Sequence, residues 1–482
     1  MDDAFISFRY SENLAAGLGL VFNWGERVEG YTNFLWTVLL AVPAWFGAGK
    51  HALGMLLTGK LLSLAFSLGS LAVVCWDKPP TAGRRLSQIP LGALFLATAA
   101  PALVWSVGAL EGPMVGFLLA LSVRLWSVEM DAGIERKTLY GSALLLALAA
   151  MTRPEPTVLI APMFALRVFF SRGRLRATWR EQLRYVLSFA IPVGLFLLWR
   201  WSYYGSWVPN TYYAKVHGDD TTLERGTNYL SEALTQMNLV PILAVACLAA
   251  LLARGEMRRV LLLIGLCGVQ LLGITYEGGD WMPGARLLVP TLPLVALLIN
   301  SAWRGACNFE LGQLRLPQLP SWVMPDEMRE RYNHWLDVGR VRAGARWSAA
   351  VAALLAAALM LAIGGGAQKT YQNWVGRAGS GFTRIQMDSG LHFEVARWMK
   401  RHVHDVGLLA TGEIGVVPYY TQLPVLDMFG LTDVHLARRK GSYHSKFDLQ
   451  YVLDRAPKYV YFLMHPAAPG KKRRPQQNHA RV

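Results

Sequence analysis

Apolar stretches of about 20 residues recur through the first 365 positions of this 482-residue chain, and no other feature constrains its fold as strongly. A helix of about 20 residues is needed to cross the roughly 30 Å hydrocarbon layer of a bilayer. Backbone groups in hydrocarbon must be satisfied within the spanning structure, which favours helices. The composition agrees, because 53% of the residues are hydrophobic and only 17% are charged, compared with about 25% charged in soluble domains. We therefore expect a mainly α, polytopic transmembrane helical bundle.

Ten segments have the length and hydropathy expected of membrane spans. They are residues 53–76, 89–108, 113–128, 138–152, 157–171, 185–202, 236–253, 260–275, 286–302 and 347–365. Segment 35–50 is also apolar, but counting it as a crossing would reverse the sides of all later loops. We expect it to be re-entrant or interfacial, in a bundle of about ten or eleven helices.

Lysine and arginine gather in alternate loops between the predicted spans. These loops are residues 78–85, 136–137, 172–184, 254–259 and 303–346. By the positive-inside rule they face the cytoplasm, so topology explains the net charge of +16 without a nucleic-acid partner. The loops of opposite parity hold the unusual polar residues and are expected to face outward.

The composition changes after about residue 368, where the apolar runs become shorter. Residues 408–411, 425–427 and 459–462 are predicted to be short buried strands, and residues 393–401 a helix. Loop parity places this small α/β domain outside the cytoplasm. The predicted organisation is a first outer loop over residues 1–34, a transmembrane bundle over 35–367 and an extracytoplasmic domain over 368–482.

Cysteine and histidine give little sign of a metal or disulfide framework. The four cysteines fall in apolar segments or in a loop expected to be cytoplasmic, and no CxxC motif is present. His51, His402 and His404 have no partner motif, so we interpret them as satisfied or solvated side chains.

Adjacent carboxylates, Asp2 and Asp3, open the chain, with Arg9 and Arg27 nearby. In sugar transfer one carboxylate can take the proton of an acceptor hydroxyl, while a second holds a metal ion or another hydroxyl. Arginine matches phosphate oxygens bidentately and keeps its charge. The alternative is that the two aspartates only cap a helix.

Three further cations, Arg153, Lys215 and Arg286, each stand at the outer end of a predicted helix, where a membrane-embedded phosphate would lie. A phosphate leaving group requires positive charge where it separates. These residues are the main candidates for donor phosphate binding, and Arg9 and Arg27 are secondary ones. The alternative is that they extend to lipid headgroups.

Polar and aromatic residues near the outer ends of the predicted helices could hold the acceptor or the sugar. The candidates are Glu29, Tyr31, Asn33, Glu111, Glu155, Trp207, Asn210, Tyr213, Asp280 and Trp281. Acidic groups at this level, which include Glu277, could also share a divalent cation, and Asp3 with Asp280 is the candidate pair for Mg²⁺ or Mn²⁺. Aromatic residues there could stack on sugar rings or only anchor the bundle at the interface.

Several motifs together resemble one class of membrane enzymes. They lie at residues 2–36, 109–113, 152–155, 207–215, 279–286 and 412–433, and include GYTN at 30–33. The sequence resembles the GT-C class of membrane glycosyltransferases, most of all the terminal arabinofuranosyltransferases that build mycobacterial cell-wall arabinan. This resemblance implies an active site on the outer face of a bacterial cytoplasmic membrane and an inverting mechanism. It also implies a polyprenyl-phosphate sugar donor, a glycan or protein acceptor, and Asp2 as the base assisted by Asp3.

One departure and two alternatives accompany this resemblance. The class has a membrane helix immediately before the first motif, and we expect that helix to be missing from the sequence as given. A transporter or lipid-sugar flippase is an alternative, although such proteins usually show internal repeats with broken helices at mid-membrane. A hexosyl or protein O-mannosyl transferase of the same class is another, because pocket shape selects the sugar.

Overall fold

The structure is a computed structural model of residues 1–482. It describes residues 2–51, 53–77, 85–131, 140–171, 175–216, 220–251, 256–280, 282, 284–308, 353–369, 381–441 and 446–462, with isolated positions 328, 350 and 372. Trp281 and most of the basic loops predicted to be cytoplasmic lie outside the described residues.

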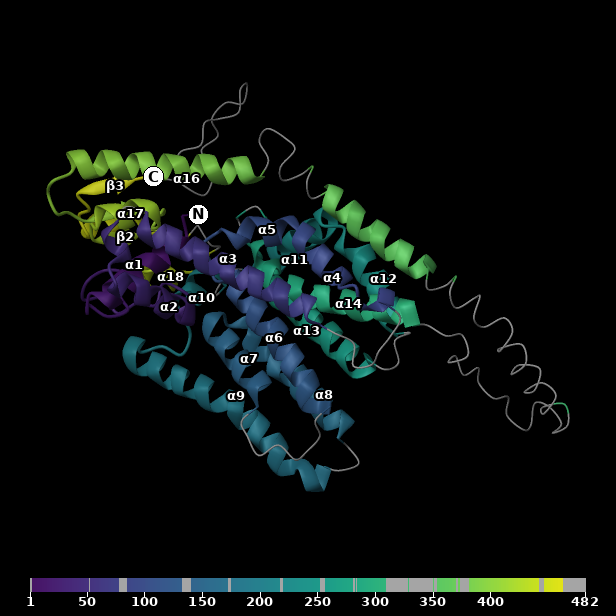
Figure 1. Ribbon diagram of the computed structural model, residues 1–482. Helices are drawn as coiled ribbons and strands as arrows, with labels where there is room; N and C mark the ends of the chain where they lie inside the picture. Colours follow the sequence, from purple (N-terminus) through teal and green to yellow (C-terminus); the bar gives the residue numbers. More distant parts are fainter. Residues whose placement is uncertain are drawn as a thin grey trace.

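The described chain is mainly helical, and five of its helical segments are long and apolar enough to cross a membrane. They are α3 (Gly54–Cys75), α6 (Gly112–Asp131), α9 (Leu175–Tyr204), α13 (Met257–Tyr276), and the run of η6 (Arg286–Thr291) with α14 (Leu292–Asn308). The last run is the most deeply buried, because α14 packs against α3, α4, α6, α12 and α13. It is the centre of the bundle (Figure 1).

Other predicted spans correspond to shorter or interrupted helices. They are α4 (Leu91–Thr98) with α5 (Ala100–Ser106), α7 (Gly141–Thr152), η3 (Glu155–Leu159) with α8 (Ile160–Phe170), α12 (Leu239–Leu251), and the apolar helix Ala353–Lys369. Segment 89–108 is broken because Ala99 is extended and Pro101 lies in the first turn of the next helix. The predicted span 236–253 is preceded by α11 (Thr222–Gln236), which meets α12 at 76° around Asn238, a residue with φ of 54°.

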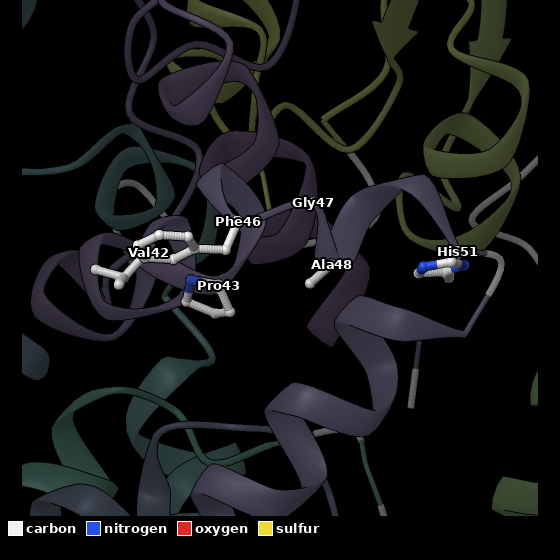
Figure 2. Close-up of a pocket in the computed structure, with 6 residues that line it drawn as sticks. All are labelled: Val42, Pro43, Phe46, Gly47, Ala48 and His51. Atoms are coloured by element: carbon white, nitrogen blue, oxygen red, sulfur yellow. The ribbon is translucent and has the colours of Figure 1, made fainter.

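The segment predicted to be the first outer loop, residues 1–34, contains a helix. Helix α1 (Ala4–Ala15) packs along α2 (Phe34–Trp45), and η1 (Ala48–Lys50) follows. Helix α2 has 12 residues and is too short to cross a bilayer alone. An apolar groove at its C-terminal end is lined by Val42, Pro43, Phe46, Gly47, Ala48 and His51 (Figure 2).

The C-terminal region contains the predicted strands in a three-stranded parallel sheet of order β2-β1-β3. Its elements are α16 (Gly381–His402), β1 (Leu409–Thr411), α17 (Val416–Thr421), β2 (Val425–Asp427), α18 (Val434–Ala437), α19 (Leu449–Asp454) and β3 (Tyr459–Tyr461). Asp433 and Asp448 accept hydrogen bonds from backbone amides at the starts of α18 and α19, as N-capping residues do. We call this region the outer domain, after the side of the membrane predicted for it.

The outer domain packs on the N-terminal helix, so the two ends of the described chain lie together (Figure 1). Asn23 donates to the carbonyl of Val425 at 2.7 Å and accepts from its amide at 3.0 Å. Asn210, the first residue of α10 (Asn210–Lys215), donates to the carbonyls of Gly430 and Leu431 at 2.8 and 3.0 Å. Because both asparagines are buried, these bonds fix the domain on the bundle.

Candidate active site

An ion-pair group joins the start of the chain to the loop before α14. Oδ2 of Asp3 lies 3.0 Å from Nη1 of Arg286, although 283 positions separate the two residues. Nε of Arg286 lies 2.7 Å from Oδ2 of Asp280, whose side chain is almost fully buried. Arg286 therefore bridges two carboxylates. One of the two aspartates predicted to be catalytic thus meets a cation predicted to bind phosphate.

Unusual backbone conformations lie next to these charges. Ala285 has a φ of 48° and Ala109 a φ of 61°. Positive φ is uncommon for residues other than glycine, and such strain of about 1–3 kcal/mol persists only where the surroundings impose it. Ala285 immediately precedes Arg286, and Ala109 lies two positions before Glu111. Both conformations therefore direct charged side chains into the same region.

A second ion-pair group surrounds Arg153, which follows α7. Its guanidinium lies 3.1 Å from Oε1 of Glu111 and 3.1 Å from Oε2 of Glu277. Its Nε also lies 2.7 Å from Oε1 of Glu155. Lys215, at the end of α10, lies within electrostatic reach of Glu277. Three carboxylates from separate parts of the chain therefore share one arginine.

The two groups form one cluster with an excess of acid: five carboxylates face three cations. Burial opposes ionisation of Glu111, but the guanidinium groups of Arg153 and Arg286 outweigh it and lower the pKa of that carboxyl. Burial and the neighbouring Glu155 raise the pKa of Glu277 to about 8 against the opposing charge of Arg153. Glu277 is therefore the group that retains a proton near neutral pH.

Asn33 connects the cluster to α1. Its Nδ2 donates to Oε2 of Glu111 at 2.9 Å and to Oγ of Ser7 at 3.1 Å. Oγ1 of Thr37 donates to Oδ1 of Asn33 at 3.1 Å. Because Asn33 is buried and both ends of its amide are paired, it orients Glu111 in this structure.

Asp2 is held by the outer domain. The amide of Val416 donates to Oδ1 of Asp2 at 2.7 Å, and a side chain at Gly415 would collide with the aspartate. Burial raises the pKa of Asp2, an effect that His392 and the Val416 amide oppose. Asp3 stands at the N-cap of α1 but makes no side-chain capping bond. The neighbouring carboxylates therefore contact different domains.

Two curated proteins are similar in sequence to this chain. It is 29% identical over 331 residues to the terminal beta-(1->2)-arabinofuranosyltransferase of Mycobacterium tuberculosis, a match that covers 61% of this chain and 51% of that protein. The protein of the same name from Corynebacterium glutamicum is 25% identical over 349 residues, with coverage of 63% and 48%. The chain thus spans about half the length of the curated relatives it matches.

The fold matches that of ArnT from Cupriavidus metallidurans. The crystal structure of its apo state aligns with a TM-score of 0.50 at 13% identity, over 88% of this chain and 80% of that one. The structure of ArnT bound to undecaprenyl phosphate gives the same TM-score. The chain has a GT-C fold and resembles the terminal arabinofuranosyltransferases. In addition, the family described as a domain of unknown function, DUF8728, matches residues 380–480.

Two of the arginines predicted to bind phosphate make other contacts. Arg9 is buried and donates to the carbonyls of Phe22, Pro418 and Leu423 at 2.9, 3.0 and 2.9 Å. Its guanidinium thus holds the outer domain on α1. Arg27 lies over the ring of Tyr203, 4.8 Å from its centroid.

Two predicted sugar-binding residues lie in a buried polar group away from solvent. Glu29 pairs with Arg200, whose Nε lies 2.9 Å from Oε2 of the carboxylate. Burial raises the pKa of Glu29 to about 7, and Arg200 opposes that shift. The hydroxyl of Tyr31 lies 3.1 Å from that of Tyr204. These contacts connect the N-terminal segment to α9.

Some residues of the segment around α10 contact the outer domain, and others lie on the surface. Asn210 has its amide on carbonyls of the outer domain, as described above. Tyr213 accepts at its carbonyl from Nζ of Lys446 at 2.5 Å. Trp207 is exposed and stacks on Trp201, with ring centroids 5.7 Å apart. Trp207 is therefore the aromatic residue of this segment best placed to meet a sugar or the lipid surface.

The candidate metal pair, Asp3 and Asp280, does not fit a metal ion as arranged here, because the guanidinium of Arg286 lies between the two carboxylates. In the described part of the chain, no three His, Cys, Asp or Glu side chains are placed to coordinate one ion. The arginine supplies the positive charge that a metal would otherwise bring to these two groups.

Sequence reasoning missed two residues, Arg200 and His392. Arg200 lies within a predicted span, and a charge inside an apolar helix is a signal that could have found it. His392 is buried in α16 near Asp2, and no local pattern marks it. Its position depends on packing between the outer domain and the first residues of the chain.

Proposed function

We propose that this chain is a membrane glycosyltransferase that moves a sugar, with arabinofuranose favoured, from a polyprenyl-phosphate carrier to a glycan or surface protein of the cell envelope. The observation that carries the proposal is the meeting of Asp3 with Arg286. The ArnT structure with undecaprenyl phosphate bound supports a lipid-linked donor. The arabinofuranosyltransferase names of the sequence relatives support the choice of sugar.

Asp2 and Asp3 have different roles in this proposal. Asp2, on the side of the outer domain, accepts the proton of the acceptor hydroxyl, and its raised pKa makes it a stronger base than an exposed aspartate. The acceptor oxygen then bonds to the anomeric carbon from the face opposite the phosphate. The bond from that carbon to the phosphate oxygen breaks, and its electron pair leaves on the carrier phosphate. The anomeric configuration is inverted.

Arg286 receives the departing phosphate. In the described structure Asp3 and Asp280 neutralise this arginine. A phosphodiester that approaches Arg286 therefore exchanges with the Asp3 carboxylate, which becomes free to hold a sugar hydroxyl beside Asp2. Arg153 is less available, because three carboxylates already surround it. Its role is to keep Glu111 and Glu155 ordered next to the donor.

We place this site at the outer surface of a bacterial inner membrane. The cluster lies at helix ends whose loops the positive-inside rule assigns to the exterior. An exposed aromatic side chain, Trp201, lies near the C-terminal end of α9, which contacts the N-terminal end of α2. Such residues are typical of the membrane–water interface.

The test is transfer from a synthetic short-chain polyprenyl-phosphate arabinofuranose to an arabinofuranosyl disaccharide by the full chain in nanodiscs. Asp2→Asn and Asp3→Asn are the test variants, and Asp131→Asn is the control, since Asp131 is an exposed carboxylate at the far end of α6. We expect at least one test variant to lose about 100-fold or more in kcat. Full turnover in both would refute the proposal.

A further inference from the structure

The loop before Arg286 has an unusual backbone conformation at several positions. Gly278, Gly279, Gly284 and Ala285 all have positive φ, of 82°, 70°, 109° and 48°. Glycine accepts such values without strain, but alanine rarely adopts them. A strained conformation persists only where the surrounding structure imposes it, so contacts from neighbouring elements must hold Ala285 in place.

Trp105 holds the backbone before Ala285. It belongs to α5, it is 1% exposed, and its indole N–H donates to the carbonyl of Gly284 at 2.7 Å. The guanidinium carbon of Arg286 lies 5.9 Å from the centroid of the same ring. At this distance a cation is still attracted to an aromatic face. One side chain therefore contacts both the backbone before Ala285 and the side chain after it.

Tyr229 holds the backbone after Arg286. It belongs to α11, and its hydroxyl accepts the backbone N–H of Leu287 at 3.2 Å. Its side chain also lies against Gly279, where a Cβ atom would come within 2.5 Å of the Cβ atom of Tyr229. The peptide groups that flank Ala285 and Arg286 are thus hydrogen-bonded to side chains from two separate helices.

Close packing fixes both of these side chains. A Cβ atom at Gly226 of α11 would lie 2.1 Å from the carbonyl oxygen of Thr275 on α13, so these two helices approach as closely as only glycine permits. A Cβ atom at Gly108 would lie 2.8 Å from the ring of Trp105. Densely packed groups transmit strain instead of yielding to it. Trp105 and the helix of Tyr229 can therefore impose the conformation of Ala285.

We propose that Trp105 and Tyr229 are positioning residues for Arg286. They hold the backbone on both sides of this arginine, so that its guanidinium bridges Asp3 and Asp280 at 3.0 and 2.7 Å. This role rests on the proposed function, in which Arg286 receives the departing phosphate. Trp105 and Tyr229 act only through the position of the guanidinium, and a misplacement of about 1 Å can cost about 100-fold in rate.

The experiment measures kcat and the KM for the donor with the full chain in nanodiscs, using the same synthetic arabinofuranose donor and disaccharide acceptor. The variants are Trp105→Phe, which keeps an aromatic ring but removes the N–H, and Tyr229→Phe, which removes one hydroxyl. We expect each to lower kcat by about 10-fold with KM changed less than about twofold, because the phosphate separates only in the transition state.

Trp126→Phe is the matched control. Trp126 is also 1% exposed, and its indole N–H donates to the carbonyl of Met163 at 3.3 Å. It lies near the C-terminal end of α6, about 20 Å along that helix from Glu111. Its replacement should lower the temperature of thermal unfolding by an amount similar to that of Trp105→Phe, with kcat unchanged. A role in stability alone would affect the two variants alike.

A double-mutant cycle with Arg286→Lys shows whether Trp105 and Tyr229 act through Arg286. Lysine lacks the planar fork that the loop orients. In this background Trp105→Phe and Tyr229→Phe should therefore each lower kcat by less than about threefold. Losses of about 10-fold in both backgrounds would show that the two residues act independently of Arg286 and would overturn the inference.

Parental kcat in both Trp105→Phe and Tyr229→Phe, with Arg286→Lys impaired, would also overturn the inference and leave the proposed function intact. Full activity of both Asp2→Asn and Asp3→Asn would instead remove the proposed function and the inference with it. If Trp105→Phe does not elute as a monodisperse protein, Tyr229→Phe decides by the same cycle. A loss of kcat that disappears in the Arg286→Lys background supports the inference, and any other result contradicts it.

Discussion

Oδ2 of Asp3 and Nη1 of Arg286 lie 3.0 Å apart, which joins the first acidic motif to the first residue of the most buried helical run. Had the two residues stood at opposite ends of the bundle, no shared pocket could exist. Arg286 also contacts Asp280, so a single guanidinium organises both carboxylates. The consequences of this arrangement can be tested separately from those of the neighbouring acidic cluster.

Arg286→Lys keeps the positive charge but loses the planar guanidinium group. An ammonium cannot hold two carboxylates or a phosphate through a planar fork, so we expect kcat to fall by about 100-fold. Stability should change less, because the lysine still partly neutralises Asp280. Steady-state transfer and thermal unfolding in nanodiscs measure the two effects. Equal kcat values for the variant and the parent would show that Arg286 does not contact the departing phosphate.

Glu277 should make stability depend on pH. Its pKa is raised from 4.5 to about 8 by burial and Glu155, so the folded chain keeps a proton that the unfolded chain releases above about pH 4.5. The contribution of Glu277 to the free energy of unfolding is therefore largest below about pH 4.5. It declines as the pH rises to about 8.

Thermal unfolding between pH 5 and 9 tests this dependence. Glu277→Gln should flatten the decline, whereas Glu224→Gln, at an exposed position of α11, should follow the parent. A Glu277→Gln curve parallel to that of the parent would contradict the assignment.

Glu29→Gln should destabilise the chain strongly. Its carboxylate pairs with Arg200 in a buried setting, and removal of one partner leaves an uncompensated charge that costs about 3–5 kcal/mol. Replacement of both residues by glutamine should recover part of this loss. Thermal unfolding of the two single variants and the double variant measures the coupling. If the loss of unfolding free energy in the double variant equals the sum of the losses in the two single variants, the ion pair has no structural role.

Ala285→Val should lower both stability and transfer. Ala285 has a φ of 48°, a conformation that β-branched residues rarely adopt, so valine should displace the neighbouring Arg286. Ala285→Gly is the control, because glycine accepts positive φ without strain. Assay of the transfer reaction and of thermal unfolding for both variants distinguishes the two. Full activity of the valine variant would show that the loop conformation is not required.

Single helices and strands were predicted well because each depends mainly on the hydropathy and propensities of its own residues. The span 53–76 appears as α3, and the three short strands predicted in the outer domain pair as a parallel sheet. Hydropathy over a window and strand-length apolar runs report on the environment of each segment by itself. Interruptions such as that at Ala99 were missed, since a break within an apolar run leaves mean hydropathy unchanged.

The sequence by itself determined a helical membrane protein with its unusual charges at helix ends, and its motifs indicated the class. Only the tertiary structure decided which charges meet. Arg9 had the same chemistry as Arg286 in the sequence, yet one holds backbone carbonyls of the outer domain and the other two carboxylates. The reason is that pairing follows from the packing of helices hundreds of positions apart, which no local pattern records.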